Sequence, residues 1–499
     1  MRRSGNKTFF KGKVGADAKV QDTKTLAMLL REYDSGGAVP FHMPGHKRNK
    51  KLEYLNGAQT IDVTEIEGFD NLHNSKDMLK YAQQRTADFF CVKESRYLVG
   101  GSTSGILAAI RATTHAGDGV LIARNCHKSV YNAVELCALR PYYVMPAYFE
   151  EYGFYGSVMP EDIQRELLIH RDIKLVVITS PTYEGVLSDI KSIAEICRKH
   201  NVLLFVDEAH GAHLGLSRRF EQSARNLGAD IVVNSMHKTL PSLTQTAVLH
   251  ICSDRVDIAA VDRNLAVFES SSPSYVLMSS IDGCVHYLTH EGAGALEAWS
   301  DMVDKFRRSF ARSKKFKIFN GAREGRVFAY DKTKLVFLTV ESSMSGIDFM
   351  RTLRSKYKIE LEMASSNYAL AMTGAGDGLP TYLALSEAVF ELENEAGQRR
   401  GLVNINGVKL PKKAFEPYEI DTLDLDFVDF ENSVGHVAAE NIWAYPPGAP
   451  IICKGEIIAQ DVLRHALFLY ECGVNVESER RAFPDNIFTV AQPSIYDVN

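Results

Sequence analysis

The sequence predicts an α/β fold with a mostly parallel, doubly wound sheet. The first observation is an alternation of short apolar runs with helical stretches, from about residue 94 to about residue 252. The second is that these apolar runs end in polar or charged residues, as strands do where their carboxyl ends border a ligand crevice. The third is size, because 499 residues with 45% hydrophobic content are enough for a large core and two or three domains.

Individual elements are expected from apolar periodicity and from the positions of glycine, proline and hydroxyl residues. The expected helices are 23–33, 76–90, 106–112, 160–170, 190–200 and 459–472, with a long helical tract over 276–313. The expected strands are 96–99, 119–123, 142–145, 174–179, 202–207, 231–233, 247–252 and 335–340.

These elements suggest four parts along the chain. We expect an N-terminal arm over 1–60, a large domain over 61–300, a small α+β domain over 301–405 and a C-terminal domain over 406–499. The acidic alternation Asp424-Leu425-Asp426 is interpreted as an exposed strand with a solvated face and not as a set of metal ligands.

Composition argues against several classes of protein. A net charge of −5 does not favour a general nucleic-acid binder. The start of the chain has no apolar segment typical of a signal peptide, and no apolar run is long enough to span a membrane. The eight cysteines include no CxxC pair, so reduced thiols in a cytoplasmic protein are expected instead of disulfides or a metal site.

A lysine and an aspartate mark the expected active site. Lys238 follows the apolar run 231–233, and by itself it could be a loop lysine that reaches solvent. Asp207 ends another apolar run 31 residues earlier, which is about one strand–helix–strand repeat. The two side chains should therefore open on one crevice, where a lysine can bind an aldehyde and a carboxylate can hold a pyridine nitrogen protonated. This pair predicts a pyridoxal phosphate site.

A glycine- and serine-rich turn supplies a candidate phosphate site. Residues 100–105 lie between an expected strand and an expected helix, where backbone N–H groups and the helix dipole favour an anion. A turn that merely caps a helix would look the same. His127 follows the strand 119–123, where a flat imidazole could stack on a bound ring, although a lone histidine is more often structural.

Taken together, these stretches resemble the ornithine/lysine/arginine decarboxylases, a family of fold-type-I pyridoxal phosphate enzymes. The similarity is greatest to its short bacterial members, which lack an N-terminal receiver-like wing domain. It covers most of the chain and is carried by residues 42–47, 101–105, 125–129, 181–185, 207–211, 235–238, 271–275 and 445–448.

The resemblance implies a role for each matching residue. Lys238 would form the Schiff base with the cofactor, Asp207 would pair with the pyridine nitrogen, and His127 would stack on the ring. Lys238 or His237 would return a proton to the α-carbon. The cofactor set also includes His210 beside Asp207, the phosphate contacts Ser102, Thr103, Ser235 and His237, and Gly101, Thr182 and, from a partner subunit, Ser272.

The implied reaction is decarboxylation of a basic amino acid within polyamine biosynthesis, by a homodimer or higher oligomer. L-Arginine, giving agmatine and CO2, is the preferred substrate, while lysine to cadaverine and ornithine to putrescine stay open. The acidic partner of the substrate's cationic tail could be Glu65, Asp70 or Glu362.

Two other functions are open. One is a different reaction on the same cofactor fold, by an aminotransferase or an aldol-type lyase; an aminotransferase should bind the α-carboxylate with a dedicated arginine, and nothing marks out Arg399 or Arg400 for this. A non-catalytic interaction protein would have no need to keep Lys238, Asp207 and His127 together. The chain departs from the family pattern at 74–78 and at 453–456, which leaves substrate fit and the local interface uncertain.

Overall fold

A seven-stranded sheet forms the centre of the molecule. The computed structural model describes residues 24–321, 325–397, 409–444 and 448–491. The strand order is β1-β10-β9-β8-β6-β2-β3. The strands are β1 (Glu94–Leu98), β10 (Ala247–Ile251), β9 (Ile231–Ser235), β8 (Leu203–Asp207), β6 (Ile173–Thr179), β2 (Gly119–Ala123) and β3 (Arg140–Val144).

The sheet is parallel except at β10, which confirms the predicted α/β class. β10 runs antiparallel to both β1 and β9, and the other neighbouring pairs are parallel. The physical reason is the short connection between β9 and β10, which holds only the one-turn helix α7 (Met236–Thr239) and a loop. A parallel return would need a longer crossover.

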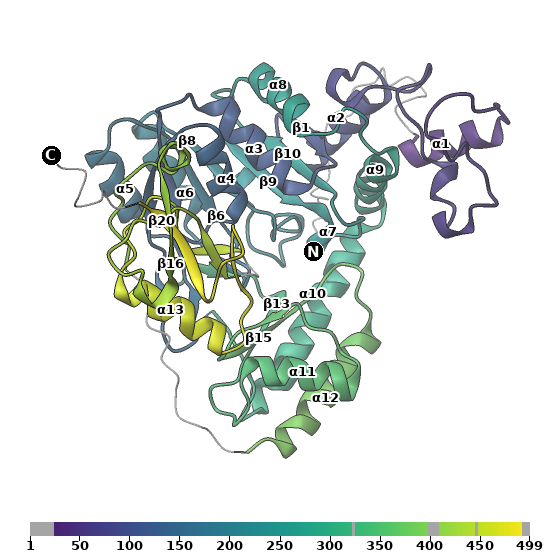
Figure 1. Ribbon diagram of the computed structural model, residues 1–499. Helices are drawn as coiled ribbons and strands as arrows, with labels where there is room; N and C mark the ends of the chain where they lie inside the picture. The colour runs from purple at the N-terminus through teal and green to yellow at the C-terminus, as the bar shows by residue number, and fades with distance from the viewer. Residues whose placement is uncertain (1–23, 322–324, 398–408, 445–447, 492–499) are drawn as a thin grey trace, which may run out of the picture.

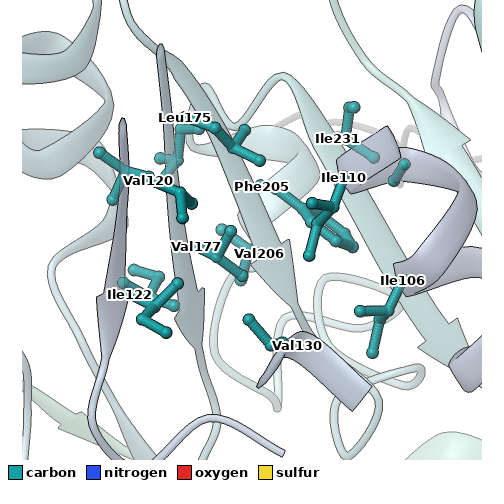
Figure 2. Packing of buried hydrophobic residues seen from close by; sticks show 14 of the residues in the cluster. Ile106, Ile110, Val120, Ile122, Val130, Leu175, Val177, Phe205, Val206 and Ile231 are labelled. Atoms are coloured by element: carbon teal, nitrogen blue, oxygen red, sulfur yellow. The ribbon is translucent and has the colours of Figure 1, made fainter. Parts of the chain in front are cut away.

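Helices cover both faces of the sheet. Leu98 and Leu249 pack into one hydrophobic core, while their neighbours Tyr97 and Val248 pack into another, because successive side chains of a strand point to opposite faces. Figure 2 shows Ile106 and Ile110 of α3 beside the apolar side chains of the central strands. The helices before and within this region are α1 (Leu26–Ser35), α2 (Met78–Phe90), α3 (Gly101–Thr113), α4 (Lys128–Leu136), α5 (Pro160–Ile169), α6 (Ile190–Lys199) and α8 (Ile258–Phe268).

A second, antiparallel sheet follows two long helices, α9 (Tyr275–His290) and α10 (Gly292–Ser309). Its order is β11-β13-β15-β14. It comprises β11 (Lys317–Ile318), β13 (Lys334–Leu338), β14 (Met363–Ala364) and β15 (Tyr368–Met372), with α11 (Gly346–Tyr357) and α12 (Leu379–Glu395). A short ladder between β7 (Val186–Leu187) and β12 (Ala329–Tyr330) ties this part to the loop that follows β6. A further hairpin pairs β4 (Tyr148–Phe149) with β5 (Phe154–Tyr155).

The C-terminal elements lie beside the central sheet (Figure 1, yellow). They are β16 (Leu425–Asp429), β17 (Ile442–Ala444), β18 (Ala449–Ile452), α13 (Gln460–Glu471), β19 (Val476–Ser478) and β20 (Asn486–Val490). β16 pairs with β20 and is largely exposed, as expected for the acidic alternation at 424–426.

The limits expected for the N-terminal arm and the three domains remain predictions. No helix among the described residues is long and apolar enough to cross a membrane.

The structure corrects some predicted elements. The residues expected to form a turn at 101–105 are the first turn and a half of α3, which was expected to begin at 106. Gly105 lets this helix lie close to the sheet, since a Cβ there would be 2.5 Å from Cδ1 of Leu98. The tract 276–313 is two helices separated at Glu291, and the helices α4 and α8 were not expected.

Candidate active site

The carboxyl ends of the central strands open on one cavity of about 360 Å³. The cavity is also bordered by residues of β14, of the C-terminal elements and of the loop after β6. Every site residue predicted from the sequence except Ser272 lines it: Gly101, Ser102, Thr103, His127, Thr182, Asp207, His210, Ser235, His237 and Lys238. The structure thus brings together residues that lie on five different strand-to-loop junctions.

Lys238 lies on α7, directly after β9, and contacts His210. The Nζ of Lys238 is 2.8 Å from Nε2 of His210. Desolvation lowers the pKa of Lys238, and the charges of Asp207 and Glu362 oppose that change. Burial lowers the pKa of His210 well below its ordinary value, and Lys238 adds to the effect. A neutral amine is therefore more accessible here than on an exposed lysine.

Asp207 is a buried carboxylate at the end of β8. Asp207 is only 3% exposed, and its Oδ1 accepts a hydrogen bond of 3.1 Å from the backbone N–H of Ala209. Burial raises the pKa of Asp207, whereas the charge of Lys238 and the Ala209 bond lower it. A desolvated carboxylate of this kind favours a cationic partner, such as a protonated ring nitrogen.

The start of α3 forms a cradle suited to an anion. Gly100 caps this helix without a side-chain hydrogen bond, and Gly101 has a positive φ of 72° that favours glycine. The hydroxyl groups of Ser102 and Ser235 are hydrogen-bonded to each other beside these backbone groups. Backbone N–H groups, hydroxyl donors and the helix dipole together favour a phosphate.

Glu269 holds this cradle in place and was not identified from the sequence. Its carboxylate accepts hydrogen bonds of 3.0 Å from the backbone N–H groups of Val99 and Gly100, and another from the hydroxyl of Ser104. Glu269 lies next to the serine-rich turn before α9, which the sequence did single out. The contact itself joins residues about 170 positions apart, so no local pattern could reveal it.

The two other histidines are held in defined orientations. His127 caps α4, and its Nδ1 accepts a hydrogen bond of 3.2 Å from the backbone N–H of Ser129. Burial, with Lys238 and Lys128 nearby, lowers the pKa of His127 to about 4. The Nδ1 of His237 is 2.9 Å from the carbonyl oxygen of Thr246 and can only donate to it, so a neutral His237 has Nε2 as its acceptor. Burial also lowers the pKa of His237.

Tyr183 is a second cavity residue whose role was not identified, although its motif was. Its ring centre is 4.2 Å from that of His210, and the Nζ of Lys238 lies 5.8 Å from the Tyr183 ring. The Tyr183 hydroxyl donates a hydrogen bond to Glu362. Glu362 is therefore the acidic candidate whose charge acts on Lys238.

The other acidic candidates lie elsewhere. Asp70 accepts hydrogen bonds from the backbone N–H groups of Lys76 and Asp77, and thereby fixes the segment 74–78 that departs from the family pattern. None of the three acidic candidates, Asp70, Glu65 and Glu362, is among the cavity-lining residues in the described part of the chain. Arg399 and Arg400, together with residues 445–447, lie outside the described residues.

Ser272 lies apart from the cavity of its own chain. It is exposed in the turn before α9, where its backbone N–H donates to the hydroxyl of Ser270. The role expected for it, contact with the cofactor of a partner subunit, stays a prediction.

Residues 453–456, the second segment that departs from the family pattern, form ion pairs between the C-terminal elements and the part of the chain around the central sheet. Lys454 pairs with Glu135 of α4 at 2.7 Å and with Asp421 at 2.9 Å. Glu456 forms a buried, two-bonded ion pair with Arg124, which follows β2 and lines the cavity.

Comparison with known proteins identifies the family. The chain matches the family described as Orn/Lys/Arg decarboxylase, major domain, over residues 25–344. It is 28% identical to an arginine decarboxylase of Bacillus anthracis over 466 residues, which cover 91% of this chain and 94% of that protein. It is 29% identical to an arginine decarboxylase of Bacillus subtilis over 459 residues, or 90% and 94% of the two chains.

Solved structures agree on the fold. Lysine decarboxylase A from Pseudomonas aeruginosa has a TM-score of 0.80 at 18% identity, covering 94% of this chain and 80% of that one. The Francisella novicida lysine decarboxylase LdcF has a TM-score of 0.78 at 18% identity, covering 94% and 81%. The family and its fold are those of pyridoxal phosphate enzymes, which implies that cofactor. This chain is a decarboxylase-type enzyme that belongs to the Orn/Lys/Arg decarboxylase family.

Proposed function

We propose that this protein binds pyridoxal phosphate and decarboxylates L-arginine to agmatine and CO2 in the cytoplasm, as a step of polyamine biosynthesis. The observation that carries the proposal is the convergence of Lys238, Asp207 and the α3 cradle on one cavity. An amine, a buried carboxylate and an anion site on separate elements match the aldehyde, ring nitrogen and phosphate of that cofactor.

The donor set of the cavity fits this cofactor. Three cavity residues carry buried polar atoms that have no hydrogen-bond partner within the described part of the chain, namely Asn125 Oδ1, Thr179 Oγ1 and His210 Nδ1. Buried polar atoms are rarely left unpaired, so a polar ligand in the cavity would satisfy them. Ser102, Thr103, Ser235 and His237 would hold the phosphate, Thr182 and Gly101 would border the cofactor, and His127 would cover one ring face.

The chain's own residues would then control binding and proton transfer. When bound, pyridoxal phosphate supplies an aldehyde for the substrate amine and a ring that accepts the electron pair left by CO2. Asp207 would favour a proton on the ring nitrogen, which would make that ring a better electron acceptor. Lys238 Nζ would hold the aldehyde in the resting enzyme. Lys238 Nζ, or His237 Nε2 once that atom carries a proton, would return a proton to the α-carbon.

Arginine is preferred as substrate because relatives that align over most of both chains, such as those of Bacillus anthracis and Bacillus subtilis, bear the name arginine decarboxylase. Glu362 could bind the cationic end of the substrate, since its charge already acts on Lys238 and it accepts a bond from Tyr183. A homodimer or higher oligomer is proposed because Ser272 is exposed and could reach the site of a second subunit.

The test is product analysis with the cofactor-loaded protein and arginine, lysine and ornithine in separate reactions. We expect agmatine and CO2 in equal amounts from arginine. Cadaverine or putrescine with matching CO2 would support decarboxylation but show that the substrate is lysine or ornithine. A keto acid without CO2 would support an aminotransferase instead, and no product with the cofactor visibly bound would refute the proposed reaction. Lys238→Ala should be inactive, whereas the exposed Lys199→Ala serves as a matched control that keeps activity.

A further inference from the structure

A second buried carboxylate borders the candidate active site. Among the described residues that line the cavity, the acidic side chains are those of Asp207 and Glu184. Glu184 lies in the loop after β6 and is 5% exposed. Its Oε1 accepts a hydrogen bond of 2.8 Å from the hydroxyl of Tyr368 in β15. Glutamate is almost never buried to this extent unless it is paired, because desolvation of a carboxylate is costly.

The described part of the chain supplies no cation for this carboxylate. The lysine and arginine side chains that line the cavity are those of Arg124, Lys238 and Lys409. Arg124 is paired with Glu456, and neither Lys238 nor Lys409 forms an ion pair with Glu184 within the described residues. A buried carboxylate without a cation favours a ligand that brings a positive charge into the cavity.

The turn that carries Glu184 is fixed before any ligand arrives. The backbone N–H of Gly185 donates to the carbonyl oxygen of Thr182 at 3.0 Å, and the backbone N–H of Asp331 donates to the carbonyl oxygen of Gly185 at 2.8 Å. Gly185 has a φ of 99°, and a Cβ there would lie 2.7 Å from Cγ of the buried Lys334. The second sheet therefore holds the backbone on one side of Glu184, and the cost of ordering this residue on binding is small.

Aromatic side chains line the same cavity as Glu184. Tyr148 of β4 and Tyr155 of β5 are cavity residues, with 5.1 Å between their ring centres. The ring of Phe154, between them in the hairpin, packs edge-on against Tyr368 at 5.5 Å, and the Tyr368 hydroxyl binds Glu184. Aromatic faces attract cations, and a planar guanidinium group suits both a ring face and a carboxylate. These residues therefore provide surroundings for the charged end of a basic side chain.

We propose that Glu184, held by Tyr368, binds the cationic end of the substrate's side chain and thereby selects a basic amino acid. The inference rests on the proposed function, because it takes a basic amino acid as the ligand of this cavity. It gives each cavity carboxylate one partner, with the ring nitrogen at Asp207 and the substrate cation at Glu184. It also favours Glu184 over Glu362, which is not among the described residues that line the cavity.

The test compares two ligands that differ in charge and hardly in shape. Agmatine ends in a guanidinium group, whereas N-carbamoylputrescine has the same chain and a neutral urea end; neither has a carboxylate to lose. Isothermal titration calorimetry with the full, cofactor-loaded protein gives both dissociation constants. We expect agmatine to bind about 10- to 100-fold more tightly, as for a charge-assisted hydrogen bond. Glu184→Gln should abolish most of this preference, since the amide keeps the size of the side chain and lacks its charge.

The matched control is Glu150→Gln, which should keep the preference. Glu150 is an exposed glutamate in the turn between β4 and β5, and it is not among the described residues that line the cavity. Circular dichroism confirms that each variant is folded. If Glu184→Gln is not folded, Tyr368→Phe decides the matter, because loss of its hydrogen bond to Glu184 should lower the preference about three- to tenfold.

Three results would overturn the inference. They are an unchanged preference in Glu184→Gln (or in Tyr368→Phe, where that variant decides), a loss of preference in Glu362→Gln but not in Glu184→Gln, and no preference for agmatine in the unchanged protein. Because binding is measured and not turnover, failure of the proposed reaction is distinguishable. A charge preference that depends on Glu184 in a protein that forms no agmatine from arginine would refute the reaction and support the inference.

Discussion

Replacing Glu456 with glutamine removes the charge that balances Arg124 at the contact between the C-terminal elements and the sheet. The two side chains are 1% and 4% exposed and joined by bonds of 2.8 and 2.9 Å. Removing one member of a buried ion pair costs about 3–5 kcal/mol, because the other charge stays desolvated and unpaired. Glutamine keeps one acceptor, so we expect the lower end, about 3 kcal/mol.

The assay is urea unfolding followed by Trp443 fluorescence. The protein has two tryptophans, so Trp299→Phe isolates this signal. Trp443 packs on Tyr131, at 5.7 Å between ring centres, and the Tyr131 hydroxyl donates to the carbonyl oxygen of Arg124. The emission of Trp443 therefore reports on the region around the ion pair.

Two further variants complete this experiment. The double variant Arg124→Gln/Glu456→Gln should recover part of the lost stability, since it leaves no uncompensated charge. Glu360→Gln breaks the exposed pair with Arg354 and should leave the urea midpoint unchanged. The reasoning is refuted if Glu456→Gln shifts the midpoint no more than Glu360→Gln, or if the double variant is less stable than the single one.

Three other predictions concern the site. Lys238→Ala should lose the visible absorption band of bound pyridoxal phosphate with an unchanged circular dichroism spectrum, and a persistent band would show that another group binds the aldehyde. Glu269→Gln should weaken cofactor binding on the order of tenfold in an absorbance titration, because its amide cannot accept from both backbone N–H groups; unchanged affinity would refute the positioning role. Folding lowers the pKa of His127 from 6.5 to about 4. As the pH falls between these values, the unfolded chain protonates His127 while the folded chain does not, so the folded protein loses stability over this range. His127→Gln should therefore gain stability relative to the unchanged protein as the pH is lowered through that range, and a pH-independent difference would contradict the assignment.

Strands of the central sheet were predictable because they are continuous apolar runs. β2 was predicted to the residue, and β6 and β10 within one residue at one end. A strand buried on both faces has few polar positions, so its limits stand out in the sequence. The direction of β10 could not be predicted in the same way, since it depends on which neighbours it meets.

Much of the candidate site was predictable for a related reason. Asp207, Lys238 and His127 each follow an apolar run, and the carboxyl ends of parallel strands meet at one edge of a sheet. Tyr183 was identified only as part of a motif. The sequence around Glu269 does not indicate its hydrogen-bond partners, and nothing in the sequence around Lys334 indicates that this lysine is buried.

The sequence by itself determined the α/β class, the central strands and the set of polar residues at their ends, because these depend on local apolar runs and on chain order. Only the tertiary structure decided which charges are buried together. Arg124 and Glu456 are buried together although they lie 332 residues apart in the sequence. Lys334 of the second sheet likewise packs against Gly185 of the loop after β6, and the ladder of β7 with β12 joins the same two parts. Such contacts carry no local periodicity, because they arise only when separate parts of the chain exclude water from the same place.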